Sequence, residues 1–163
     1  MKNNKVLFIS QGAIIAALYV ALTHISNMAG LASGAVQIRL SEALTILPVF
    51  TPAAIPGLFI GCLISNLTTG CIPWDIVGGS MATLIGALGT YALRNHSYAA
   101  PVPPILANMI IVPFVLAYAY QFEGTIPYFM LTVGIGEVIC CGIMGMLLMT
   151  ALKRHSRSIN WAH

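Results

Sequence analysis

Residues 43–74 read ALTILPVFTPAAIPGLFIGCLISNLTTGCIPW, and this stretch contains no Asp, Glu, Lys or Arg. Its breaks fall at Thr51-Pro52 and between Gly70 and Pro73, because proline restricts the residue before it and cannot continue a helix. Apolar helices of about 20 residues cross a hydrocarbon core of about 30 Å. The stretch therefore predicts helices that lie in a membrane and are joined by tight turns.

The rest of the chain has the same character. Of the 163 residues, 58% are hydrophobic and only 7% are charged, and the mean hydropathy is +0.90. A soluble domain carries about 25% charged residues. Further runs without a charged residue cover 6–38, 76–93, 95–122, 124–136 and 138–152. We predict an all-α fold, an integral membrane bundle of six transmembrane helices that forms a single domain over residues 1–163.

The six helices are expected near residues 6–25, 35–50, 53–70, 74–93, 103–121 and 126–152. The second is short, and Pro113 should kink the fifth. The uncharged run 6–38 is too long for the apolar region of a signal peptide, so no cleaved leader is expected.

The distribution of Lys and Arg predicts the orientation. With the N-terminus in the cytoplasm, six spans place every basic residue except Arg39 inside, whereas five spans place the C-terminal cluster outside. The inner basic residues are Lys2, Lys5, Arg94, Lys153, Arg154 and Arg157. We therefore expect a multi-pass protein of the cell membrane with both termini cytoplasmic.

The same topology places the remaining charges in the outer half or near the midplane. These residues are Arg39, Glu42, Asp75, Glu123 and Glu137. An ionisable residue inside a membrane is costly and usually has a function. Arg39 and Glu42 are three apart, hence neighbours on one helix face, as a structural ion pair or as part of a solute pocket. Asp75 could cap a helix or bind solute, and Glu137 needs a partner from elsewhere or from a ligand.

Other polar and aromatic residues extend this candidate substrate site. Trp74 and Tyr128 are candidates for stacking on a planar ligand, although aromatic belts are the ordinary explanation. Asn66 offers both a donor and an acceptor. Asn108 lies toward the inner end of the fifth helix and carries less weight.

Several classes of function are not indicated. The chain has no GxxxxGK[ST] phosphate loop, so any ATP-driven process needs a partner subunit. The sequence shows no recognisable pair of a nucleophile and a base, and we expect no catalytic residue, metal or cofactor in this chain. The net charge of +3 comes from clusters at the two ends and reports on topology rather than on nucleic acid. The cysteines lack metal-ligand spacing and should be small buried hydrophobes; they are Cys62, Cys71, Cys140 and Cys141.

Small residues recur at a spacing of four, which lets helix backbones approach closely in lipid. Gly57, Gly61 and Ser65 form one row, and Gly78, Ala82, Gly86 and Thr90 form another. We expect both to serve packing within the chain. Ala13, Ala17 and Ala21 form a third row, which could pack internally or dock a partner helix.

Two connected segments carry a family resemblance. IRLSEALTILPVFTPAAIPGLFIGCLISNLTTG at 38–70 and PWDIVGGSMATLIGAL at 73–88 resemble the QueT family. That family consists of substrate-binding S components of energy-coupling factor (ECF) transporters, and the resemblance covers essentially the whole chain.

The resemblance implies six helices with both termini inside and capture of a queuosine precursor, a 7-deazaguanine such as queuine, from outside. It also implies a transmembrane T component, contacted through Ala13, Ala17 and Ala21, and two cytosolic ATPase subunits that use ATP. Glu42, Asp75, Glu137 and Asn66 would accept the N–H groups of such a ligand, and Arg39 would meet a carbonyl oxygen.

Two other functions stay open. One is a standalone secondary transporter for a nucleobase-like or amine solute, coupled to protons through Glu137. The other is a membrane enzyme or scaffold.

Overall fold

The structure, a computed structural model, describes residues 2–31, 36–121 and 124–155. Within these ranges all regular structure is helical, which confirms the predicted all-α class. In chain order the elements are α1 (Lys2–Met28), η1 (Leu40–Val49), α2 (Ala54–Thr68), α3 (Pro73–Ala92), α4 (Val102–Phe114), η2 (Val115–Ala119), α5 (Ile126–Glu137), η3 (Val138–Met144) and α6 (Gly145–His155). Glu123 and Arg157, which entered the topology above, lie outside the described residues.

Three helical stretches are long and apolar enough to cross a bilayer, judged by length and composition. They are Asn4–Met28, Val102–Ala119 and Ile126–His155. Leu40–Val49 and Ala54–Thr68 are shorter apolar helices. The helical segments coincide with the expected ones to within a few residues at most boundaries, whereas the number that cross the bilayer stays a prediction.

The second segment differs most from expectation. Residues 36–39 are not helical, and η1 is a 3₁₀ helix of 10 residues rather than an α-helix over 35–50. At about 2.0 Å per residue it extends about 20 Å, less than the hydrocarbon thickness. The side chains from Ser41 to Pro48 are buried, because η1 packs against α1, α2, α3, η3 and α6. This short helix thus forms the centre of the bundle, with a polar residue, Glu42, in its first turn.

The two glycine-containing rows pack within the chain, as predicted. A methyl group at Gly61 would lie 2.8 Å from Tyr19 Cβ, so α1 and α2 touch at backbone distance there. A methyl group at Gly86 would lie 2.7 Å from Pro104 Cα, which brings α3 equally close to α4. These contacts fix α1 to α2 and α3 to α4 on either side of η1.

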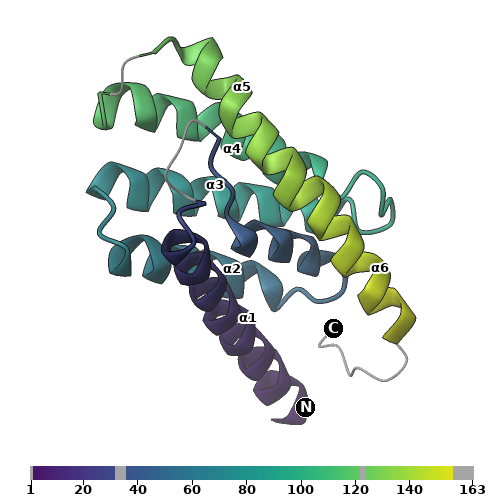
Figure 1. The fold of residues 1–163 in the computed structure, drawn as a ribbon. Helices are drawn as coiled ribbons and strands as arrows, with labels where there is room; N and C mark the ends of the chain where they lie inside the picture. Colours follow the sequence, from purple (N-terminus) through teal and green to yellow (C-terminus); the bar gives the residue numbers. More distant parts are fainter. Residues whose placement is uncertain (1, 32–35, 122–123, 156–163) are drawn as a thin grey trace.

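The alanine row on α1 behaves differently. Ala13, Ala17 and Ala21 are exposed, and the neighbouring Ile14 and Leu18 are exposed as well. In Figure 1, α1 lies along one side of the bundle, so only part of its circumference is covered. The row therefore does not pack within this chain.

The last helical stretch is one rod in Figure 1, made of α5, η3 and α6. Its middle part, Val138–Met144, is a π-helix that begins directly after Glu137. The fifth stretch also contains such a segment, since α4 stays helical through Pro113 and widens into η2 two residues later. π-Helical turns in α-helices are frequent at functional sites.

Candidate functional site

A polar pocket lies inside this apolar bundle. It encloses about 390 Å³ of empty space, part of it open to the surroundings. Its lining comes from the segment before η1, from η1 itself and from α3, α4 and α5, and consists of Gln37, Arg39, Glu42, Gly79, Thr83, Asn108, Val112, Val133 and Glu137.

Glu42 is the most deeply buried charge in the pocket, with 3% of its surface exposed. Its Oε1 atom accepts a hydrogen bond from the hydroxyl group of Tyr19, a buried residue of α1. Its Oε2 atom is buried and has no hydrogen-bond partner among the described residues. Buried polar atoms in folded proteins are nearly always hydrogen-bonded, so this oxygen marks a place where a ligand group can bind.

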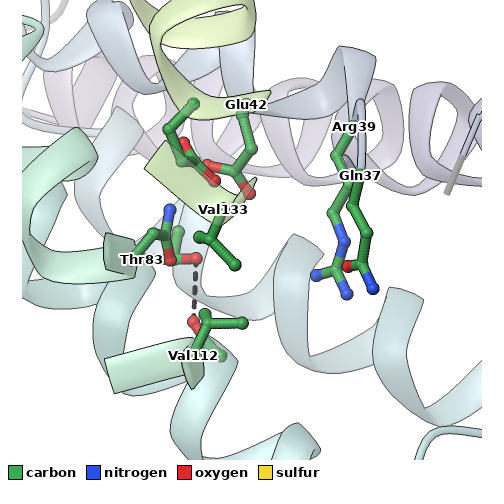
Figure 2. A pocket seen from close by; sticks show the side chains of 9 residues that line it. Gln37, Arg39, Glu42, Thr83, Val112 and Val133 are labelled. Atoms are coloured by element: carbon green, nitrogen blue, oxygen red, sulfur yellow. Dashed lines mark hydrogen bonds between the residues drawn. The ribbon is translucent and has the colours of Figure 1, made fainter. Parts of the chain in front are cut away.

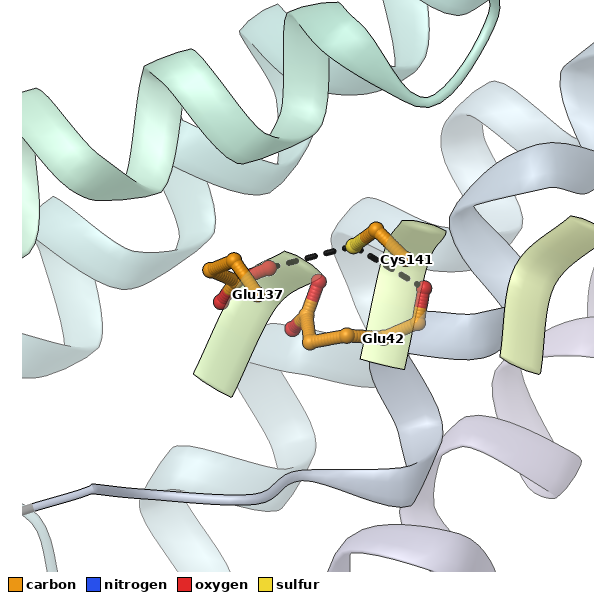
Figure 3. A group of neighbouring side chains, drawn as sticks. All are labelled: Glu42, Glu137 and Cys141. Carbon is orange, nitrogen blue, oxygen red and sulfur yellow. Dashed lines mark hydrogen bonds between the residues drawn. The ribbon is translucent and has the colours of Figure 1, made fainter. Parts of the chain in front are cut away.

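Glu137 faces Glu42 from the end of α5. The Cys141 thiol donates to Glu137 Oε2 at 3.1 Å, and the same sulfur lies 3.4 Å from the Glu42 carbonyl oxygen (Figure 3). Three possible ligand atoms lie within 4.8 Å of one another, one each from Glu42, Glu137 and Cys141, and this group could hold a cation. Cys141 is therefore part of a polar cluster, which its apolar surroundings in the sequence did not indicate.

Arg39 does not share a helix face with Glu42, contrary to the sequence prediction. Its backbone is extended, with φ −103° and ψ 103°, and it stands just before η1. Within the part of the chain that is described, no carboxylate comes within 4.0 Å of its guanidinium group, so the predicted ion pair is not formed. Figure 2 shows Arg39 and Gln37 side by side at one side of the pocket, with Glu42 and Thr83 at the other.

The position of this extended segment depends on Gly136. A methyl group at Gly136 would overlap the backbone carbonyl oxygen of Gln37. The helix α5 can therefore approach the segment only because residue 136 has no side chain. This contact sets the segment of Gln37 and Arg39 against α5 at the residue before Glu137, and all three side chains line the same pocket.

Asn66 and Asp75 lie behind the pocket rather than in its lining. The Asn66 amide is 3.5 Å from the Asp75 carbonyl oxygen, and Asp75 Oδ2 accepts a hydrogen bond of 3.1 Å from the Tyr120 hydroxyl group. A methyl group at the lining residue Gly79 would lie 3.0 Å from Asn66 Nδ2. Both residues thus border the pocket through Gly79.

The two aromatic residues expected to stack on a ligand are outside the pocket. Trp74 is 73% exposed and Tyr128 is 47% exposed. Tyr128 packs edge-on against Phe129, with the ring centroids 5.8 Å apart. Neither ring lines the pocket, and Val112 and Val133 supply its apolar wall instead.

Some lining residues were missed by sequence reasoning or given too little weight. Asn108 is buried and lines the pocket, although its place along the fifth helix suggested a position nearer the inner end. Gln37 and Thr83 gave no signal, because polar residues of this kind are common in loops and in small-residue rows. Tyr19 could have been noticed as a hydroxyl-bearing residue in an otherwise apolar helix.

A helical, apolar protein with several stretches long enough to cross a bilayer is a multi-pass membrane protein. The model of the QueT transporter family matches residues 9–154, and this chain belongs to that family. Membership in a transporter family agrees with the expectation that the chain is not an enzyme.

A curated relative gives a further comparison. The queuosine precursor transporter QueT of Lactococcus lactis subsp. cremoris (strain MG1363) is 37% identical over 86 residues, which is 52% of this chain and 50% of that protein. The match thus spans about half the length of the relative. No solved structure matches the chain.

Proposed function

We propose that this chain is the substrate-binding S component of an ECF importer and captures a queuosine precursor, a 7-deazaguanine, from outside the cell. The family and the relative's name support the substrate. The observation that carries the proposal is the pocket, which gathers Arg39, Glu42 and Glu137 within an apolar bundle.

The chemistry of the pocket suits such a ligand. A guanine-like ring presents N–H donors side by side, and a carboxylate can accept two of them in parallel. Glu42 has a buried oxygen free to accept. Arg39 and Gln37 supply donors for a ring carbonyl oxygen. The flat faces of the ring would contact Val112 and Val133 rather than Trp74 or Tyr128, which lie outside.

The test is equilibrium binding to the full chain in lipid nanodiscs. We expect a 7-deazaguanine to bind without nucleotide and to be recovered chemically unchanged by mass spectrometry. Adenine serves as a ring of similar size with a different donor pattern and should bind far more weakly. Chemical conversion of the ligand, or no binding of any 7-deazaguanine, would contradict the proposal.

The partners follow from the same proposal. An S component works with a transmembrane T component and two cytosolic ATPase subunits, and both termini of this chain would lie in the cytoplasm. The exposed row of Ala13, Ala17 and Ala21 supports docking of a partner helix, since small residues allow close helix contact in lipid. No ATP would bind to this chain.

Ala17→Leu is expected to leave ligand binding within about twofold and to reduce uptake by cells to a small fraction of the parental rate. A bulky side chain at this exposed position would hold the partner helix away without entering the pocket. Binding by the purified chain and uptake of labelled ligand by cells provide the two measurements.

The matched control is Ala151→Leu, the same change at an exposed position of α6. It should leave both binding and uptake unchanged. Parental uptake by the Ala17→Leu protein would show that the row does not dock a partner, and loss of its binding would show that α1 instead supports the pocket.

A second candidate function is a standalone secondary transporter coupled to protons through Glu137. The contact between the Glu137 carboxylate and the Cys141 thiol favours it, because it places a second group with an exchangeable proton beside a carboxylate that lines the pocket. The purified chain in proteoliposomes separates the two functions. Uptake driven by a proton gradient, with no ATPase subunit present, would favour the standalone transporter.

A further inference from the structure

We infer that Glu42 and Glu137 together form a subsite for a positively charged nitrogen of the ligand, a primary ammonium group. The inference rests on the proposed function and adds to it a charge that the preferred ligand must carry. Glu42, Glu137 and Arg39 line the same pocket, so the pocket has one acidic side and one basic side (Figures 2 and 3).

The first step of the argument is the close approach of two acids. The ligating atoms of Glu42 and Glu137 lie within 4.8 Å of each other. Two negative charges at that distance repel each other strongly when they are removed from water. Arg39 does not relieve the repulsion by direct pairing, because no carboxylate among the described residues lies within 4.0 Å of it. A cation between the two carboxylates would relieve it.

The second step is the number of acceptors that remain. Tyr19 occupies Glu42 Oε1 and Cys141 occupies Glu137 Oε2, whereas Glu42 Oε2 is buried without a partner in the described part of the chain. An ammonium group carries three donors and no acceptor. Glu42 Oε2 and the Glu137 carboxylate are thus acceptors that line the same pocket. One ammonium group can donate to both at once, which an uncharged group with a single N–H cannot do.

The third step distinguishes an organic cation from a metal ion. Glu42, Glu137 and Cys141 could hold a divalent ion, but a bare ion would use only the acidic side of the pocket and leave the side of Arg39 unused. The Cys141 thiol also has one proton to donate, with Glu137 Oε2 at 3.1 Å and the Glu42 carbonyl oxygen at 3.4 Å as its two possible acceptors, and a metal ion on the sulfur would displace that proton. An extended ligand, with an acceptor toward Arg39 and an ammonium group toward the acids, uses both sides of the pocket.

A comparison of three ligands on the parent chain tests the inference. They are 7-deazaguanines that carry at position 7 an aminomethyl group, an ethyl group of the same size without charge, or a cyano group. We expect the aminomethyl compound to bind about ten- to a hundredfold more tightly than the ethyl compound, as for a charged hydrogen bond. Isothermal titration in nanodiscs at pH 7, with EDTA present, measures the affinities.

Glu137→Gln should remove most of this preference and change the affinity for the ethyl compound much less. Glu42→Gln is the second variant, and Ala151→Leu, at an exposed position of α6 outside the pocket, should retain the preference. Circular dichroism and gel filtration establish that each variant is folded. The ligand comparison on the parent chain stands even if a variant fails to fold.

Each contrary outcome has a separate meaning. Equal affinity of the aminomethyl and ethyl compounds overturns the inference and leaves the proposed function intact. No binding by any of the three overturns the proposed function, and the inference falls with it. Two outcomes overturn the inference in favour of a metal site. One is tight binding of Zn²⁺ alone in EDTA-free buffer, in competition with the aminomethyl compound. The other is a preference for the aminomethyl compound that disappears when EDTA is added.

Discussion

Gly136→Ala is expected to weaken ligand binding by about a hundredfold, although it adds only one methyl group. That methyl group would overlap the Gln37 carbonyl oxygen, so the segment carrying Gln37 and Arg39 must move away from α5. In the proposed mode of binding, the ligand would then lose hydrogen bonds from both side chains, one of them charged. Together these amount to about 3 kcal/mol, or roughly a hundredfold in affinity.

Gly134→Ala is the matched control on the same helix. A methyl group there would lie 3.1 Å from the Met109 sulfur, which belongs to a flexible side chain that can move aside. Binding should therefore stay within a few-fold of the parent, while thermal unfolding in detergent compares the stability of the two variants. If both variants bound the ligand equally, the approach of α5 to residue 37 would have no role in the site.

Arg39→Gln has the second large effect, an expected loss of about ten- to a hundredfold in affinity. Arg39 is a cation that lines the pocket, and the variant removes both its charge and its paired donors. Arg39→Lys should recover little, because an ammonium group does not reproduce the planar fork of a guanidinium. Titration of the parent chain and the two variants with one 7-deazaguanine measures the effect.

Arg94→Gln provides the control for loss of a positive charge. Arg94 is exposed, its guanidinium carbon lies 4.4 Å from the centre of the Tyr91 ring, and it does not line the pocket. We expect parental affinity. If Arg39→Gln bound the ligand as tightly as Arg94→Gln, Arg39 would have no direct part in binding.

The positions of the helices could be predicted from the sequence because charges and prolines interrupt the apolar runs at nearly every helix end. The form of the second helix could not. Hydropathy indicates which residues leave water, whereas the 3₁₀ geometry of η1 depends on the five elements that pack around it. The extended backbone at Arg39 depends on the same packing, and it separates a pair of residues that a helix would have brought together.

The candidate site was predictable where burial of a charge is itself unusual. Arg39, Glu42 and Glu137 stood out for that reason, and the structure gathers them in one pocket. Their roles in binding stay predictions. Trp74 and Tyr128 show the opposite case, because an amphipathic ring suits a membrane surface as well as a ligand, and the structure leaves both exposed.

The position of Asn108 along its helix did not indicate that this residue lines the pocket. Asn108 of α4 lines the same pocket as Glu42, which lies in the first turn of the short central helix η1. Gln37 and Thr83 could not be found without the fold, since the chain brings them together from different elements.

The π-helical turn after Glu137 sets the rotation of α5 relative to α6 about the axis of the last helical rod. Each residue of an α-helix rotates the chain by about 100°, so a rod with one residue fewer in Val138–Met144 would turn α5 by that angle relative to α6. The face of α6 that packs on η1 would then no longer coincide with the face of α5 that carries Glu137. The π-helical turn lets one continuous helix pack on η1 through α6 and direct Glu137 of α5 toward the pocket. The position of Glu137 therefore depends on the number of residues in Val138–Met144 more than on which residues they are.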